Sequence, residues 1–213
     1  MRREVIPEAI GRQEEILRSR TRQLDITARM GQAIARETDL ETLLSTTVEM
    51  IRGQLGHYHA QVFLLDDLHR NAVLRASTGT AGQELLRRGH RLAVGSESVI
   101  GQVAALGEPV LASDTEHAEF WLPNPLLPRT RAELAVPLRL GDRIIGALDV
   151  QSVDPNVFDE LTIVALQTVA DQLAVAIRNA QLLEEKEGLL SASVQLTQTL
   201  TRDGWERYAE IVD

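Results

Sequence analysis

The spacing of apolar residues changes several times along the chain, and each change predicts a different element. From about residue 8 to residue 36 the sequence is polar, and Ile10, Leu17 and Leu24 recur at intervals of seven residues. This pattern predicts a long helix, and it fits a coiled coil and an amphipathic helix packed on a core equally well. A second helix is predicted after Asp39, because an Asp can cap the first turn and the following apolar residues share one face.

The next part of the chain predicts short strands and short helices. Residues 59–66 and 71–77 are apolar or β-branched runs joined by a polar link, which is typical of a β-hairpin. Four further elements are predicted, namely a helix over 82–88, a strand over 90–94, a helix capped by Ser96 or Ser98 that runs to Leu106, and an edge strand over 109–112.

Three prolines mark the segment 115–131, which has neither the period of a strand nor that of a helix. We expect a long ordered loop or a lid here. The clearest strands of the chain follow at 132–140 and 143–152, and the Gly-Asp pair at 141–142 between them suits a tight hairpin turn. Pro137 has no N–H group, so we expect it at an edge or a bulge of the sheet.

A closing helix is predicted from Asp159 to beyond the edge of the domain. Its apolar residues first suit packing on a sheet and then follow the spacing of a short coiled coil. Neither terminal helix has enough sheet beside it to cover its apolar side, so we expect a homodimer built from these helices. The expected dimer contacts are Leu17, Leu24, Leu173, Ala176, Ala180, Leu183 and Leu190.

In chain order, these elements predict an α+β fold. A central antiparallel sheet of about five to six strands would carry long N- and C-terminal helices on one face, and loops and short helices on the other. We expect a dimerisation helix over 1–36, the domain itself over 37–185, and a coiled-coil extension over 186–213 that leads to a further domain.

Composition narrows the possible functions. The chain has 213 residues, and its 22 basic and 31 acidic side chains give a net charge of −9, which argues against a nucleic-acid surface. It has no cysteine, which removes thiol nucleophiles, thiolate metal sites and thioether attachment of a chromophore. Lys186 is its only lysine and lies in an acidic run, which disfavours Schiff-base chemistry. With no signal peptide and no apolar run near the ~20 residues that cross a membrane, we expect a cytoplasmic protein.

Five motifs taken together resemble one protein family. They are the run Gly107-Glu108-Pro109-Val110, the proline-rich loop at 122–128, the strands at 133–138 and 145–152, and the closing stretch at 171–180. In this order they resemble bacterial GAF domains, over roughly residues 24 to 185. GAF domains are small-molecule-binding sensory and dimerisation modules, so the resemblance implies an input domain that serves an output domain such as a kinase, a cyclase or a regulator.

The chain lacks the sequence signatures of several ligand-binding classes within the family. Cyclic-nucleotide-binding members carry an Asn-Lys … Phe-x-x-x-Asp-Glu signature, whereas here Phe158, Asp159 and Glu160 are contiguous and no lysine precedes them. Bilin-holding members and the reductases of free methionine sulfoxide use cysteines that this chain lacks. The ligand and any cofactor are therefore left open by the sequence.

In the family the ligand lies between the sheet and the loop-rich side. This implies seven candidate ligand-binding residues, Phe63, Ser98, Val99, Ile100, His117, Trp121 and Arg131. Each also has a purely structural interpretation: the serine as a helix cap, the tryptophan as an anchor for its loop, the phenylalanine as core, and the histidine and arginine as solvated side chains.

Catalysis and metal binding are not expected. The sequence shows no Ser-His-Asp order and no paired carboxylates in a setting that would bury and tune them. Asp66 and Asp67 beside His69 suit backbone hydrogen bonds in a hairpin turn better than a metal ion. We therefore expect a non-enzymatic sensor that passes ligand state to an output domain, and the alternative is a scaffold whose self-filled pocket leaves only a dimerising role.

Overall fold

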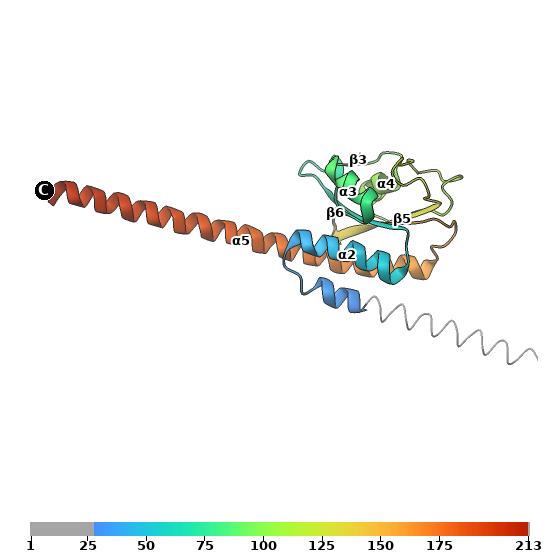
Figure 1. The fold of residues 1–213 in the computed structure, drawn as a ribbon, viewed down its shortest axis with the longest axis horizontal. Coiled ribbons are helices and arrows are strands. Elements are labelled where there is room, and N and C mark those ends of the chain that lie inside the picture. The colour runs from blue at the N-terminus through green and yellow to red at the C-terminus, as the bar shows by residue number, and fades with distance from the viewer. Residues whose placement is uncertain (1–27, 213) are drawn as a thin grey trace, which may run out of the picture.

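A six-stranded antiparallel sheet with the order β3-β2-β1-β6-β5-β4 forms the centre of the molecule. The computed structural model describes residues 28–212 (Figure 1). The elements in chain order are α2 (Leu40–Leu55), β1 (His59–Leu65), β2 (Asn71–Ser77), α3 (Gly79–Arg87), β3 (Arg91–Ala93), α4 (Val99–Leu106), β4 (Val110–Ala112), β5 (Ala132–Leu140), β6 (Arg143–Ser152) and α5 (Glu160–Val212). The predicted α+β fold is confirmed.

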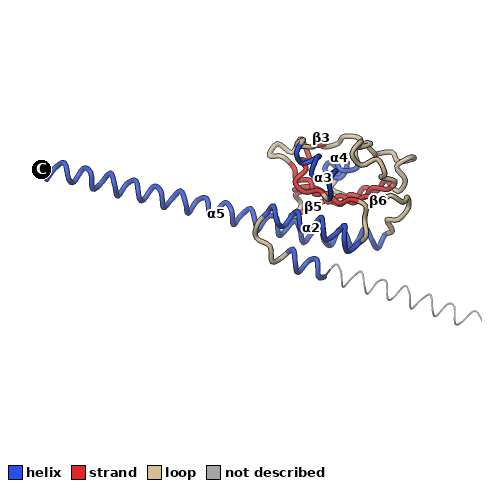
Figure 2. The backbone as a smooth tube through the Cα atoms, in the orientation of Figure 1, coloured by secondary structure: helices blue, strands red, loops and turns tan. Residues whose placement is uncertain are grey.

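The sheet separates two layers that differ in character (Figure 2). The helices α2 and α5 and the helical residues 28–34 lie against one face, whereas α3, α4 and the loop after β4 cover the other. Strands β1 and β5 are therefore buried over nearly their whole length. The predicted separation of long helices from loops and short helices is confirmed for the described residues.

Local signals in the sequence explain where the helices begin and end. The Asp39 carboxylate accepts a hydrogen bond from the Thr42 N–H at 2.8 Å and caps α2. Ser98 Oγ accepts from the Gly101 N–H at 3.0 Å and caps α4. Gly56 ends α2 with a left-handed φ of +73°, which a glycine adopts without strain.

Some predicted boundaries shift in the structure. Helix α3 begins at Gly79 rather than at residue 82, because Thr78 stands at its N-cap and directs its hydroxyl to the Ala60 N–H of β1 instead of capping the helix. Pro137 lies where β4 no longer covers β5, since β4 pairs only with Glu133–Ala135. The missing N–H therefore leaves no gap in the ladder, as expected for an edge position.

The larger core lies between the sheet and the long helices. Alternate residues of β5, Leu134, Val136 and Leu138, are buried against this helical layer. Leu173 and Ile177 of α5 are fully buried there. A buried side chain of this size stabilises the fold by about 1.5–3 kcal/mol, so this layer fixes α5 firmly on β5.

Helix α5 continues far beyond the sheet (Figure 1). By length and composition its segment 160–195 could cross a membrane, and 39% of the most apolar window is buried in the domain. Of the expected dimer contacts, Leu17 and Leu24 lie outside the described residues. Leu173, Ala176 and Ala180 are covered within the chain itself, whereas Leu183 and Leu190 are exposed.

Candidate ligand-binding site

A cavity of about 270 Å³ lies on the loop-covered side of the sheet. Its walls come from β1, α3, the start of β3, the first turn of α4 and the loop after β4, and its floor comes from β5 and β6. The apolar part of the wall includes Phe63, Leu85, Ile100 and Trp121. This volume, near the lower end of the range of small-ligand pockets, is sufficient for a small organic molecule.

The loop that carries Trp121 is tied down at both ends. At its base, the Thr115 N–H donates to the Arg131 carbonyl at 2.9 Å, and the Thr115 hydroxyl donates to the Thr130 carbonyl at 3.1 Å. Nearer its tip, Asn124 Oδ1 accepts from the Leu126 N–H at 3.0 Å. The buried Leu127 anchors the same stretch in the core. Trp121 is therefore held over the cavity by an ordered loop.

Three polar side chains, Gln61, Glu133 and Gln151, line the floor, and the buried Asp149 lies among them without lining the cavity. Gln61, Glu133, Asp149 and Gln151 lie on the same face of three neighbouring strands, because Gln61 pairs with Asp149 and Glu133 pairs with Gln151. All four are at most 5% exposed. Asp149 is also diagonal to Glu133, so the register brings two carboxyl groups together beneath the cavity.

Hydrogen bonds orient this floor. The Gln151 side-chain amide donates to Asp149 Oδ2 at 3.0 Å, and Gln151 Oε1 accepts from the Thr130 hydroxyl at 2.7 Å. The Trp121 indole N–H donates to Glu133, and a further hydrogen bond joins Glu133 to Asp149. The loop and the floor are thus connected through the tryptophan.

The two carboxyl groups are strongly perturbed. Burial raises the pKa of Glu133 well above its usual range, and the charge of Asp149 and their hydrogen bond raise it further. Burial also raises the pKa of Asp149 to about 7, although hydrogen bonds from Gln151 and Glu133 act in the opposite direction. The two carboxyl groups therefore titrate as a pair, and the pair takes up a proton at a higher pH than two solvated carboxyl groups would.

The structure brings together four of the seven expected ligand-binding residues. Phe63, Ser98, Ile100 and Trp121 line the cavity. The Ser98 hydroxyl also serves as the cap of α4, and Phe63 is part of the smaller core. The ligand-binding and structural interpretations thus apply to the same side chains.

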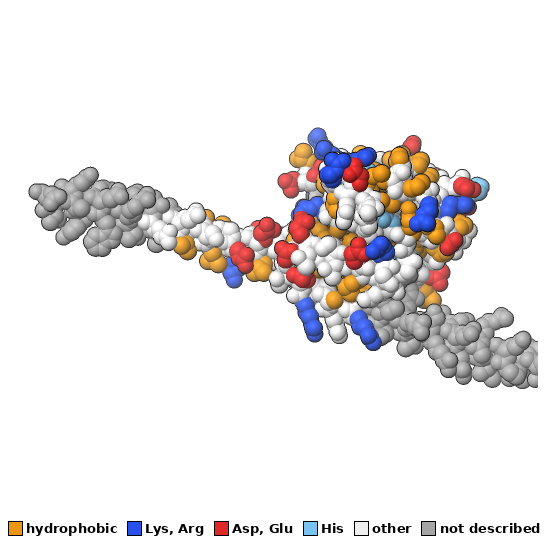
Figure 3. Space-filling view, viewed as in Figure 1, with side chains coloured by type: hydrophobic (Ala, Val, Ile, Leu, Met, Phe, Trp, Pro, Cys, Tyr) orange, Lys and Arg blue, Asp and Glu red, His pale blue; other side chains and the backbone are white. Residues whose placement is uncertain are grey.

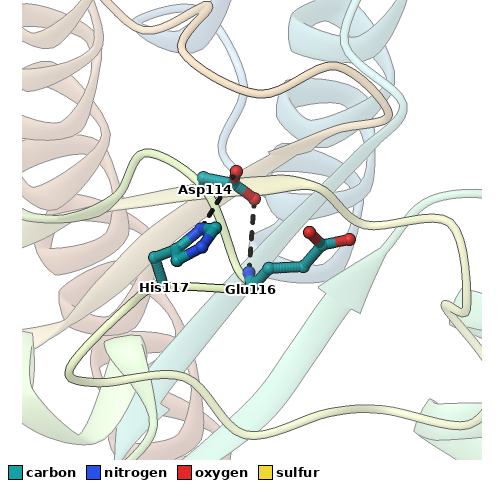
Figure 4. Close-up of side chains that lie close together, drawn as sticks. All are labelled: Asp114, Glu116 and His117. Carbon is teal, nitrogen blue, oxygen red and sulfur yellow. Dashed lines mark hydrogen bonds and ion pairs between the residues drawn. The ribbon is translucent and has the colours of Figure 1, made fainter.

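The other three expected residues do not line the cavity. Val99 is fully buried in the smaller core. The His117 side chain is 79% exposed, and Arg131 forms ion pairs with Asp114 at 3.2 Å and Glu116 at 3.4 Å. Figure 4 shows Asp114, Glu116 and His117 close together on the loop. Their potential ligand atoms lie within 4.8 Å of one another. Because Arg131 already balances these carboxylates, the cluster is an ion-pair network at the base of the loop.

The expectation that the chain holds no buried carboxylate pair is wrong. Glu133 and Asp149 are such a pair, and each stands in a strand whose other residues are mainly apolar. A signal for them was present, because Glu133 is followed by apolar residues and Asp149 alternates with Ala147 and Gln151 on the face opposite the large core. In a sheet covered on both faces, such residues point into a buried site and not into water.

Comparison of the sequence with models of protein families identifies the family of this chain. The model of the GAF domain matches residues 37–178, which is most of the chain. The chain belongs to the GAF domain family. The resemblance inferred from its motifs is thereby confirmed.

Relatives of this GAF domain include a regulator and two domains of known structure. It is 29% identical over 173 residues to the anaerobic nitric oxide reductase transcription regulator NorR of Vibrio vulnificus, over 77% of this chain but only 31% of that protein. The GAF domain of a phosphoenolpyruvate-protein phosphotransferase from Coxiella burnetii is 24% identical, with a TM-score of 0.70 over 78% of this chain and 98% of that one. The corresponding Acinetobacter domain is 28% identical, with a TM-score of 0.65 over 75% and 94%.

Another structural neighbour corrects the expectation about catalysis. The free methionine-R-sulfoxide reductase of Neisseria meningitidis, solved in complex with its substrate, matches 75% of this chain and 90% of its own, with 23% identity and a TM-score of 0.65. This likeness contradicts the expectation that the GAF domain is not an enzyme, because the same fold forms reductases. Neither the fold nor the sequence pattern is therefore a reason to exclude catalysis.

Proposed function

We propose that this GAF domain is the cytoplasmic sensory module of a signal-transduction protein, and that a small molecule in the cavity is its signal. The observation that carries the proposal is the cavity itself, which combines an aromatic wall with a buried, hydrogen-bonded polar floor. Such a combination is typical of small-molecule sites, where a few polar groups fix the orientation of a ligand held by apolar walls.

Strand β5 offers a route from the cavity to α5. Glu133 of β5 lines the cavity, whereas Leu134 and Val136 point to the opposite face and pack in the helical core. The Pro137 carbonyl accepts a hydrogen bond from the Gln167 side chain of α5 at 3.1 Å. A ligand that shifts β5 would thus bias the position of α5, provided that it binds two arrangements with different affinity.

Helix α5 is also the basis of the proposed homodimer. Its buried face continues beyond the sheet as the exposed apolar residues Leu183, Leu190 and Val194, which share that face by helical periodicity. Figure 3 shows apolar side chains along the part of α5 that projects from the domain. Pairing this stripe with the same stripe of a second chain would cover it and place two helices side by side for signal transfer.

The proposed output lies in a further domain. This chain corresponds to less than a third of the length of the curated relative that it matches, and that relative is named as a transcription regulator. A kinase, a cyclase or a regulator would suit an input through α5 equally well. We propose that residues 37–185 form the sensor, residues 1–36 contribute to the dimer, and residues 186–213 lead to the output domain.

Trp121→Ala tests the sensory role. We expect native mass spectrometry of the purified chain to show a dimer with a discrete bound mass, and this substitution to remove the bound mass from most dimers without dissociating them. The reason is that Trp121 both lines the cavity and donates to Glu133. Phe120→Ala is the matched control, because Phe120 is an aromatic residue of the same loop that does not line the cavity.

The scaffold alternative makes the opposite prediction. A dimer at twice the chain mass in every preparation, with no compound of a metabolite panel raising the melting temperature, would favour a module that only dimerises. A ligand that binds the folded state alone should stabilise it by about 2.7 kcal/mol at 100 times its dissociation constant, which a thermal shift detects.

Leu190→Asp tests the dimer surface. We expect a charge at this exposed position of α5 to weaken dimerisation at least about 100-fold, because it would be desolvated against the apolar stripe of the second chain. Sedimentation equilibrium measures the effect. Leu106→Asp is the control, since Leu106 is similarly exposed, at 62% against 56%, but lies on α4. Equal dissociation by both substitutions, or by neither, contradicts the proposed surface.

A further inference from the structure

Several polar side chains that line the cavity already have hydrogen-bond partners within the chain. The Trp121 indole N–H donates to Glu133. The Thr130 hydroxyl donates to Gln151 Oε1 at 2.7 Å. Ser98 Oγ accepts a hydrogen bond at 3.0 Å in the first turn of α4. The lining groups that remain without a partner therefore decide which ligand fits.

The polar groups that remain are N–H donors. Gln61 lines the cavity and is only 2% exposed, and its amide nitrogen donates to none of the residues 28–212. Its Oε1 is enclosed, so the amide N–H groups are what Gln61 can offer a ligand. Asn124 Oδ1 accepts from the Leu126 N–H at 3.0 Å, whereas its Nδ2 has no partner in the described part of the chain. Since a buried donor without an acceptor is costly, these groups favour a ligand that accepts hydrogen bonds.

Arg88 adds a positive charge at the mouth of the same cavity. Its side chain is 59% exposed, and its Nε donates to Glu84 at 2.7 Å. Among the described residues, its Nη1 and Nη2 form no hydrogen bond or ion pair. Glu84 is shared with Arg87, which donates to both of its carboxylate oxygens, at 2.8 and 2.7 Å. One carboxylate thus serves two guanidinium groups, and the free fork of Arg88 fits a further carboxylate.

The other titratable groups that line the cavity permit an anion. Burial lowers the pKa of His90, so its ring is neutral near pH 7 and still has one N–H to donate. Burial raises the pKa of Glu133, and the pair it forms with Asp149 therefore carries less negative charge near neutral pH than two solvated carboxyl groups would. Ser98 and Ile100 bring the first turn of α4, the positive end of its dipole, to the same cavity.

We propose that the cavity binds a small organic carboxylate that carries a second oxygen acceptor. The carboxylate pairs with Arg88 at the mouth, the second oxygen accepts from the Gln61 amide at the floor, and the apolar body packs against Phe63 and Trp121. This inference rests on the proposed function, because it names the ligand class for the same cavity. An inorganic anion would satisfy the donors but leave the apolar walls and most of the roughly 270 Å³ without a partner.

Calorimetry with three matched probes tests the assignment of the ligand. The probe 4-oxo-4-phenylbutyrate carries a carboxylate and a ketone, 4-phenylbutyrate lacks the ketone, and 4-phenylbutyramide also lacks the charge. We expect the affinity to fall at least about five-fold at each of these two steps at pH 7. Because Arg88 is partly exposed, the preference for the carboxylate over the amide should also decrease as salt is added.

Two substitutions separate the two contacts. Arg88→Met should abolish the preference for carboxylate over amide, and Gln61→Leu should abolish the preference for the ketone. Arg87→Met is the matched control, because Arg87 pairs with the same Glu84 and is 73% exposed but does not line the cavity. Its probe affinities should stay within about three-fold of those of the unmodified chain.

The possible failures are distinguishable. Equal affinity for the carboxylate and the amide, equal losses in Arg87→Met and Arg88→Met, or a full ketone preference in Gln61→Leu would each overturn the assignment. If native mass spectrometry still shows a bound mass that Trp121→Ala removes, the sensory role stands and only the ligand class fails. If no mass and no probe binds, both proposals fail.

Discussion

Gly146→Ala is expected to destabilise the fold by at least about 3 kcal/mol, because a methyl group at this position collides with backbone that has no room to move. Gly146 lies in β6, between β1 and β5. A Cβ placed there would overlap the Phe63 carbonyl oxygen and lie 3.1 Å from the Leu64 Cα. Since β6 is paired on both sides, it cannot retreat without breaking one of its ladders.

Thermal and urea unfolding monitored by circular dichroism measure this effect. For a domain of this size each kcal/mol lowers the melting temperature by about 2–4 °C, so a loss of about 6–12 °C or more is expected. Gly53→Ala is the matched control, because Gly53 lies within α2 and a Cβ there meets no atom within 4 Å. That substitution should be neutral or stabilise by up to about 1 kcal/mol. A Gly146→Ala melting curve that overlays that of the unmodified chain would contradict the close approach of β1 and β6.

The fold was predictable from sequence to the extent that its signals are local. Asp39 and Ser98 mark helix starts because a short polar side chain can satisfy the N–H groups of a first turn. The Gly-Asp pair at 141–142 marks a hairpin because Gly141 adopts a φ of +59° there. The sequence pattern predicts a start of α3 that is too late, because the Thr78 hydroxyl accepts a hydrogen bond from a strand residue 18 positions earlier, which no local pattern reports.

The apolar periodicity of α5 did not distinguish residues that pack on the sheet of the same chain from residues left exposed for a second chain. Leu173, Ala176 and Ala180 have the spacing of a coiled-coil contact, yet α5 uses them to cover its own sheet. The same face continues as Leu183 and Leu190 once the sheet ends. A helical pattern gives the face that is apolar, but whether a sheet or a second chain covers it depends on the length of the strands beneath.

The sequence predicted some residues of the candidate site but not its carboxyl pair, again because burial depends on which elements cover a residue. Phe63, Ser98, Ile100 and Trp121 could be chosen from their places in the predicted elements. The carboxyl pair was harder to recognise, because a charged residue in an antiparallel strand usually faces water and the apolar residues around it in the strand are a weak signal of burial. Only the register of three strands, together with a loop that closes over them, turns such residues into a buried cluster.

Burial of the pair gives stability a definite dependence on pH. A carboxyl whose pKa is raised on folding binds its proton more tightly in the folded chain, so the folded state is favoured at low pH. This contribution is complete below the unfolded pKa of Asp149, 3.8, and is lost as pH rises through its folded pKa of about 7. The raised pKa of Glu133 acts in the same direction.

Asp149→Asn should therefore gain stability relative to the unmodified chain as pH rises from 4 to 8. The amide cannot ionise, yet it can still accept from the Gln151 side chain, which now donates to Asp149 at 3.0 Å. We expect the difference in unfolding free energy between the two proteins to change by on the order of 2–4 kcal/mol over this range, measured by urea unfolding at each pH. Asp142→Asn should show a constant difference, because its side chain is exposed before and after unfolding. A constant difference for Asp149→Asn as well would mean that the carboxyl is solvated in the folded chain, and that the floor of the cavity is open to water.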